Sequence, residues 1–169
     1  MRCASKPPIS IKATLVLQPN LRTIATRAVG GAGGIALMET LARWADAPLM
    51  TVPFATSIVM IMGAPESPPA RPHCVIGGHI ISAAAGIVCT LFFGHEPWVA
   101  AIGVGMAIAL MHIFDAFHPP AGINPIIITT TQATPLFIIA PVASGALILT
   151  AYAYLYHRAS GERWTASQS

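Results

Sequence analysis

The sequence predicts an all-α membrane protein, a polytopic transmembrane helix bundle with four full spans and one short or re-entrant helical segment. Of its 169 residues, 54% are hydrophobic and only 9% are charged, whereas a soluble domain carries roughly 25% charged residues. The mean hydropathy is +0.67. The apolar residues form long continuous runs, which are typical of membrane helices rather than of strands that alternate at every second residue.

Five apolar segments form one membrane domain, residues 23–157, between a polar tail at 1–22 and a second polar tail at 158–169. The segments lie at 23–44, 49–63, 73–94, 99–117 and 135–156. The second segment reaches only about 22 Å at about 1.5 Å per residue, short of the roughly 30 Å hydrocarbon core. It also contains Pro53. We therefore expect either a tilted span or a re-entrant half-helix.

Small residues recur at a spacing of four in three segments. They are Gly30 and Gly34 in the first, Gly78, Ser82 and Gly86 in the third, and Ala101, Gly105 and Ala109 in the fourth. Such faces let the backbones of two membrane helices approach closely. We expect the third and fourth segments to form an antiparallel hairpin, packed small face to small face, and the glycine-rich faces to suit a homo-oligomer.

Basic residues before the first acid, Glu39, indicate a cytoplasmic N-terminus. With four spans, both tails share the cytoplasmic side, which then holds six basic residues against two outside; five spans give five against three. The positive-inside rule thus favours four membrane spans over five. We expect an integral protein of the bacterial inner membrane that contacts lipids. We do not expect binding to nucleic acid, because the basic residues behind the net charge of +3 are explained as a signal for membrane orientation.

Several polar residues are expected to collect at one end of the predicted hairpin. His79 near the start of the third segment and His112 near the end of the fourth come to similar depth, and Arg71 lies in the adjoining loop. His112 and Asp115 are three residues apart and share a helix face. Ionisable groups at membrane depth are costly and mark functional sites.

Proline breaks the chain beside these residues. Pro119 disfavours helical conformation at His118, so the fourth segment should end near Phe117. A new short helix is expected to begin at Pro119 or Pro120. The N–H groups of Ala121, Gly122 and the following residues would attract an anion at that helix end, and Asn124 adds an amide donor. Broken helices in a bundle interior are a recurring way to build transporter sites.

The run His118–Gly122, HPPAG, resembles the signature of the HPP family of small integral membrane proteins. Residues 67–73 and 76–79 resemble its second pattern, and Ala55–Ser57 resembles its small-residue-plus-Ser stretch. The matching motif residues include Pro119, Pro120, Gly77 and Gly78. The resemblance covers residues 23–156 and implies four spans and a transporter. Plastid and cyanobacterial members are linked to nitrite transport, which implies a small inorganic anion as substrate.

Three functions remain open from the sequence. The first is a passive or proton-coupled carrier of a small anion, because histidine titrates near neutral pH. The second is a metal- or haem-binding membrane protein that uses His79, His112, Asp115 and His118. The third is a non-catalytic subunit of a larger membrane complex. No nucleophile–base spacing, phosphate loop or cofactor fingerprint is evident, so we predict neither an enzyme nor a bound cofactor or metal ion.

Overall fold

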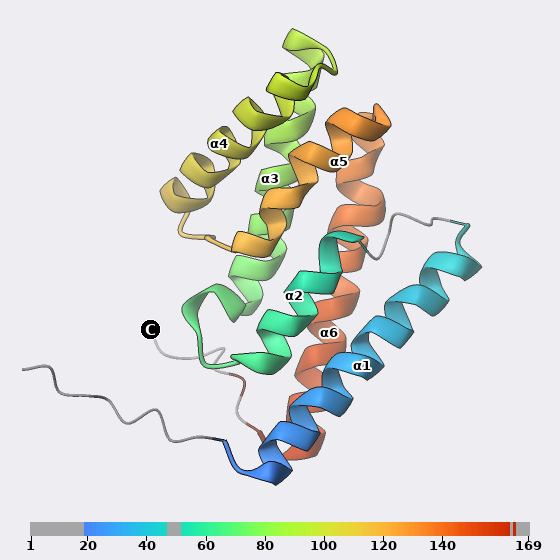
Figure 1. Ribbon diagram of the computed structural model, residues 1–169, viewed down its shortest axis with the longest axis vertical. Coiled ribbons are helices and arrows are strands. Elements are labelled where there is room, and N and C mark those ends of the chain that lie inside the picture. The colour runs from blue at the N-terminus through green and yellow to red at the C-terminus, as the bar shows by residue number, and fades with distance from the viewer. Residues whose placement is uncertain (1–18, 47–51, 163, 165–169) are drawn as a thin grey trace, which may run out of the picture.

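The computed structural model describes residues 19–46, 52–162 and 164, and these residues are helical throughout apart from short connections (Figure 1). The α-helices are α1 (Leu21–Trp44), α2 (Val52–Gly63), α3 (Pro72–Phe93), α4 (Pro97–Ile113), α5 (Asn124–Thr131) and α6 (Ser144–Ser160). The prediction of an all-helical bundle is confirmed for this part of the chain. The two predicted tails fall largely outside the described residues.

The two ends of the described chain lie at the same end of the bundle. Tyr156 near the end of α6 donates from its hydroxyl to the carbonyl of Thr26 in α1, at 2.7 Å. Arg27 Nε lies 3.3 Å from Glu162 Oε2. This arrangement suits an even number of membrane crossings. Two helical stretches among the described residues are long and apolar enough to cross, Pro72–Phe93 and Pro135–Ser160, so the number of four spans stays a prediction.

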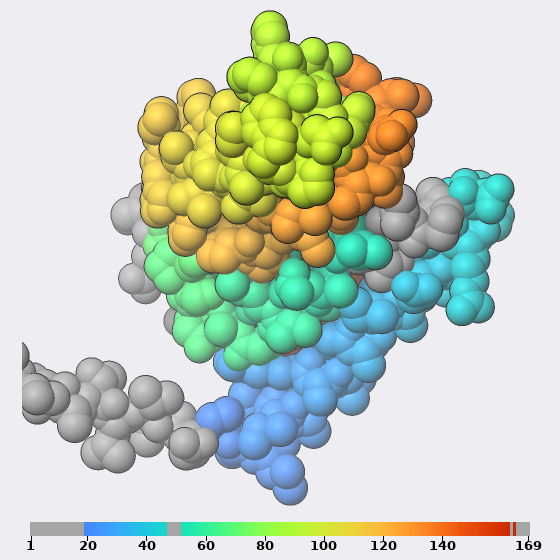
Figure 2. Space-filling model, turned by 45° about the horizontal axis from the view of Figure 1, so that its top comes forward, coloured from blue at the N-terminus to red at the C-terminus, as the bar shows by residue number. Residues whose placement is uncertain are grey.

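Short helices occupy the centre of the bundle. α2 has 12 residues and α5 has 8, so neither matches the roughly 20 residues of a full span. In Figures 1 and 2, the orange chain around α5 lies directly against the green of α2. The short second segment of the sequence prediction is confirmed as a short helix.

The end of α4 differs from the prediction. The helix stops at Ile113, four residues before the predicted end at Phe117. Asp115 takes a left-handed conformation with φ of 50°, and the Ala116 N–H donates to the Met111 carbonyl at 2.8 Å. This backbone bond closes the helix end before Pro119 is reached. A 3-10 turn, Pro119–Ile123, then begins at the predicted proline and leads directly into α5.

The last predicted segment is interrupted at its start. A 3-10 turn at Pro135–Ile138 is followed by a kinked stretch, Ile139–Ala143, in which Ala140 has non-helical dihedral angles before Pro141. Proline disfavours helical conformation at the residue before it. α6 then continues to Ser160, beyond the predicted end at Tyr156.

The small-residue face of α3 is confirmed as a close-contact face, but its main partner is residues 118–131, here called the broken segment, rather than α4. A Cβ added at Gly78 would lie 2.7 Å from His118 Cβ, and one at Gly86 would lie 2.8 Å from Pro125 Cα. Ser82 donates from Oγ to the Ala121 carbonyl at 2.7 Å. This face therefore positions the segment that begins at His118.

The predicted small face of α4 is wrong. Its three residues, Ala101, Gly105 and Ala109, are exposed. The face turned inward contains Val99, Gly103, Ala107 and Met111, all buried. An added Cβ at Gly103 would lie 2.8 Å from Pro125 Cβ. Because α4 contains small residues on two faces, spacing alone does not identify the one that packs.

The glycines of α1 are mostly covered inside the chain. An added Cβ at Gly30 would lie 2.6 Å from the Tyr156 ring, and one at Gly34 would lie 2.6 Å from Ile58 Cδ1. The predicted close helix contact is thus confirmed, with α6 and α2 as the partners. Gly31 faces open space. Self-association through glycine-rich faces stays a prediction.

Candidate functional site

Four polar side chains from four parts of the chain meet in the interior. Ser57 comes from α2, His79 from α3, His118 from the turn before Pro119, and Asn124 from the first residue of α5. Each is 0% exposed. Buried polar groups of this kind require hydrogen-bond partners, and these side chains supply most of those partners to one another.

Ser57 bridges the two histidines. Its Oγ lies 2.8 Å from His79 Nε2 and 2.9 Å from His118 Nε2. The two imidazole centroids are 5.2 Å apart, and the Phe54 ring packs against His79 at 4.8 Å. A single hydroxyl thus links α2, α3 and the broken segment.

The outer nitrogen of each histidine has its own partner. His118 Nδ1 donates to the Pro69 carbonyl at 2.7 Å. On the other side, Asn124 Nδ2 donates to His79 Nδ1 and to the His79 carbonyl, each at 3.2 Å. The hydrogen-bonded chain therefore runs from Asn124 through His79, Ser57 and His118 to the loop before α3.

These partners fix the positions of the hydrogens in the neutral chain. A carbonyl only accepts, so His118 carries its hydrogen on Nδ1 and accepts at Nε2. The Asn124 NH₂ only donates, so His79 accepts at Nδ1 and carries its hydrogen on Nε2. The Ser57 hydroxyl consequently accepts from His79 and donates to His118. All donors point in one direction along the chain.

One atom of the cluster has no partner. Asn124 Oδ1 is buried and makes no hydrogen bond in the described structure. An unsatisfied buried polar atom costs roughly 1–3 kcal/mol. The amide cannot be reversed without cost, because its Nδ2 serves the His79 carbonyl. Asn124 Oδ1 is therefore an acceptor available to a water molecule or another donor at the cluster.

The local sequence explains why these side chains meet. Gly78, one residue before His79, lets the backbone at Ala116 and the Cβ of His118 approach α3. Gly77 makes similar room for Ala116, whose Cβ would lie 3.1 Å from an added one. The two prolines that follow His118, Pro119 and Pro120, start the 3-10 turn that delivers Asn124.

Of the predicted site residues, the structure brings together His79, His118 and Asn124. It does not bring in His112 or Asp115, which are both exposed. His112 instead stacks on Phe117, with ring centroids 4.1 Å apart. The polar cluster around His79 thus contains His118 rather than His112, whose side chain lies on an exposed face of α4.

Two further predictions concern the backbone near the break. The N–H of Ala121 donates to the His118 carbonyl at 3.0 Å, so this group is not free to hold an anion as expected. A Cβ added at Gly122 would meet no atom within 4 Å, so this glycine is not needed for close packing. Arg71 occupies the N-cap position of α3 and is half-buried, outside the hydrogen bonds that link the four-residue cluster.

Ser57 was missed as a site residue. The sequence marks it only through its place in the Ala55–Ser57 stretch. Its role depends on how far α2 inserts between α3 and the broken segment, and the spacing of residues within α2 does not encode that depth.

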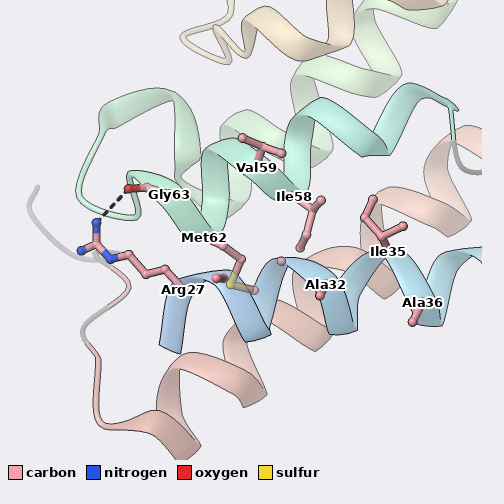
Figure 3. Close-up of a pocket in the computed structure, with 10 residues that line it drawn as sticks. Arg27, Ala32, Ile35, Ala36, Ile58, Val59, Met62 and Gly63 are labelled. Carbon is pink, nitrogen blue, oxygen red and sulfur yellow. Dashed lines mark hydrogen bonds between the residues drawn. The ribbon is translucent and has the colours of Figure 1, made fainter. Parts of the chain in front are cut away.

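Two open grooves border α2. One, of about 690 Å³, lies between α1 and α2 and is lined mainly by apolar side chains, with Arg27 at one end donating to the Gly63 carbonyl (Figure 3). The other, of about 800 Å³, is lined by Thr56, Pro69 and Pro119 among others. The second groove adjoins the residues that flank His118. Neither groove contains a polar cluster, so the buried residues are the stronger candidate site.

Comparison with known proteins gives one family. The family model described as "HPP, transmembrane region" matches residues 17–165. Two proteins from Dictyostelium discoideum, each named as a transmembrane protein, are 35% identical over 118 residues and 36% identical over 104 residues. These alignments cover 65% and 57% of this chain, but only 38% and 36% of the relatives. No solved structure matches.

Proposed function

The chain belongs to the HPP transmembrane family and is an integral membrane protein, and we propose that it transports a small inorganic anion such as nitrite. The observation that carries the proposal is the buried cluster of Ser57, His79, His118 and Asn124. Titratable and polar groups in a membrane interior are costly, and transporters place them at substrate sites. Here the cluster lies where two short helices replace full spans, an arrangement typical of transporter sites.

The size and chemistry of the cluster favour a small substrate. Its hydrogen bonds are 2.7 to 3.2 Å long, so only a small ion or water molecule fits between the partners after a limited rearrangement. Imidazole and amide N–H groups are suitable donors to a carboxylate-like oxygen pair such as that of nitrite. The proposed site residues are His79, His118 and Asn124, with Ser57 added from the structure.

The proposal includes an inner bacterial membrane as the location and a cytoplasmic N-terminus, on the basis of the basic residues before Glu39. The open side of Gly31 suits contact with a second copy. The metal-binding alternative gains no support, because the described residues hold no group of three His, Cys, Asp or Glu side chains arranged around one position.

The test is nitrite uptake by liposomes that contain the purified protein. His118→Asn keeps an amide donor for the Pro69 carbonyl but removes the nitrogen that bonds Ser57. We expect uptake to fall to the level of protein-free liposomes while the thermal unfolding temperature stays close to that of the wild type. Uptake by both proteins at equal rates would remove His118 from the pathway. Uptake by neither would reject nitrite, and the same assay with other small anions would follow.

A further inference from the structure

The neutral cluster has no donor to offer to an anion. The Ser57 hydroxyl donates to His118, His79 Nε2 donates to Ser57, and His118 Nδ1 donates to the Pro69 carbonyl. Both hydrogens of Asn124 Nδ2 go to His79. An anion can therefore bind these described residues only if one of these hydrogen bonds is broken.

The cluster can accept one proton by rotation of a hydroxyl. Ser57 Oγ has a second acceptor within reach, the Pro53 carbonyl at 3.3 Å. When a proton from water binds the lone pair of His118 Nε2, this nitrogen becomes a donor to Ser57 Oγ. The Ser57 hydrogen then turns to the Pro53 carbonyl, and the oxygen accepts from both histidines. The proton comes from a hydronium ion, whose O–H bond breaks as the N–H bond forms and which is left as water, and no heavy atom of the cluster has to move.

His79 does not offer the same capacity. Its outer nitrogen, Nδ1, faces Asn124 Nδ2, which can donate but cannot accept. A second hydrogen on His79 would point one donor at another. The geometry thus distinguishes the two histidines and assigns the added proton to His118, the one that adjoins the groove lined by Pro69 and Pro119.

We propose that His118 takes up one proton with each transported anion, so that the two ions cross together without net charge. This inference rests on the proposed anion transport. An imidazolium in the interior is costly without a counter-charge, and so is a buried anion. Proton and anion therefore raise each other's affinity by the same factor.

The surroundings of His118 contain few other titratable groups that could replace it. His79 and Cys74 lie on α3, with Arg71 at the start of that helix, and Asp115 and His112 precede His118 in the chain. His79 shares Ser57 with His118. Asp115 and His112 are exposed and lie outside the cluster.

The protonation step can be observed apart from transport. Nitrogen-15 NMR of histidine-labelled protein distinguishes the two neutral tautomers and the imidazolium. We expect neutral His118 to carry its hydrogen on Nδ1 and neutral His79 on Nε2. Adding sodium nitrite at constant pH should convert His118, and not His79, to the imidazolium. An Nε2–H tautomer of His118, or no change of His118 with nitrite, would overturn the proposal.

The coupling is measured in liposomes that report nitrite entry and internal acidification together, with valinomycin and potassium setting the membrane potential. We expect one proton for each nitrite and a final accumulation independent of potential, corrected for protein-free liposomes. An uncoupled monovalent anion would change its accumulation about fiftyfold for each 100 mV. Potential-dependent nitrite entry without protons refutes the coupling but leaves anion transport intact. Absence of nitrite entry rejects nitrite as the transported anion, and the NMR result then decides the protonation step by itself.

Ser57→Ala removes the acceptor for protonated His118, and Ser82→Ala is the matched control. Ser82 is equally buried, and its hydroxyl serves the Ala121 carbonyl rather than a histidine. A hydrogen bond to a charged group is worth roughly a ten- to hundredfold change in equilibrium. Proton-coupled uptake should fall by that factor in Ser57→Ala and persist in Ser82→Ala. Equal coupled uptake in both variants would exclude Ser57 as the switch.

Discussion

Gly78→Ala is expected to push α3 away from the turn that carries His118. An added Cβ lies 2.7 Å from His118 Cβ and 2.9 Å from the Ala116 carbonyl oxygen. Both contacts are with atoms on or next to the backbone, so neither neighbour can swing aside as the tip of a long side chain could. Overpacking of a well-packed interior costs roughly 1–3 kcal/mol. The shift also moves His79, the next residue of α3, away from His118, so nitrite uptake should fall with stability.

Gly105→Ala is the matched control for this prediction. Gly105 also lies inside a helix, but an added Cβ there meets nothing within 4 Å. Alanine favours a helix interior over glycine by about 1 kcal/mol, and both variants share that gain. In detergent, thermal or denaturant unfolding of the two proteins should therefore differ by roughly 1–3 kcal/mol, with Gly78→Ala less stable. Equal stability of the two variants would refute the close approach of α3 and the turn.

Two further variants test the assignment of residues to the site and to the fold. His112→Ala should leave nitrite uptake near the wild-type rate, because His112 is exposed and stacks on Phe117 outside the cluster; a loss as large as that of His118→Asn would return His112 to the pathway. Arg27→Gln should lower the free energy of unfolding by roughly 1–3 kcal/mol, since Arg27 contacts Gly63, Glu66 and Glu162. Arg22→Gln, at an exposed position of the same helix, is its control, and equal stability of the two would show that the contacts of Arg27 contribute little.

The positions of the helices could be predicted from the sequence because hydropathy and proline act locally. Pro72 and Pro97 lie in the first turns of α3 and α4, and Gly94 ends α3 with φ of 78°. The end of α4 could not be predicted in this way. It depends on the left-handed turn at Asp115, a conformation that aspartate adopts only when its neighbours favour it.

Sequence reasoning predicted those site residues whose polar side chains are unusual in an apolar segment. Histidine and asparagine in an apolar chain are conspicuous, so His79, His118 and Asn124 were found. Ser57 was not, since serine is also a common packing residue in membrane helices. His112 and Asp115 were included because His112 was expected at the depth of His79 and Asp115 on the same helix face as His112. Side-chain type indicated the chemistry, whereas the path of the backbone decided which groups meet.

The small-residue face of α3 joins packing and site geometry in one feature. Gly78 admits His118, Ser82 holds the Ala121 carbonyl, and Gly86 admits Pro125. These three contacts fix the broken segment along its length, so His118 and Asn124 are held on opposite sides of His79. Larger residues at Gly78 and Gly86 therefore alter stability and transport together, whereas Ser82→Ala adds no atom to this face. Substitutions at Ser57 change the hydrogen bonds without removing these contacts, and for that reason Ser57→Ala is the variant that separates the chemistry from the fold.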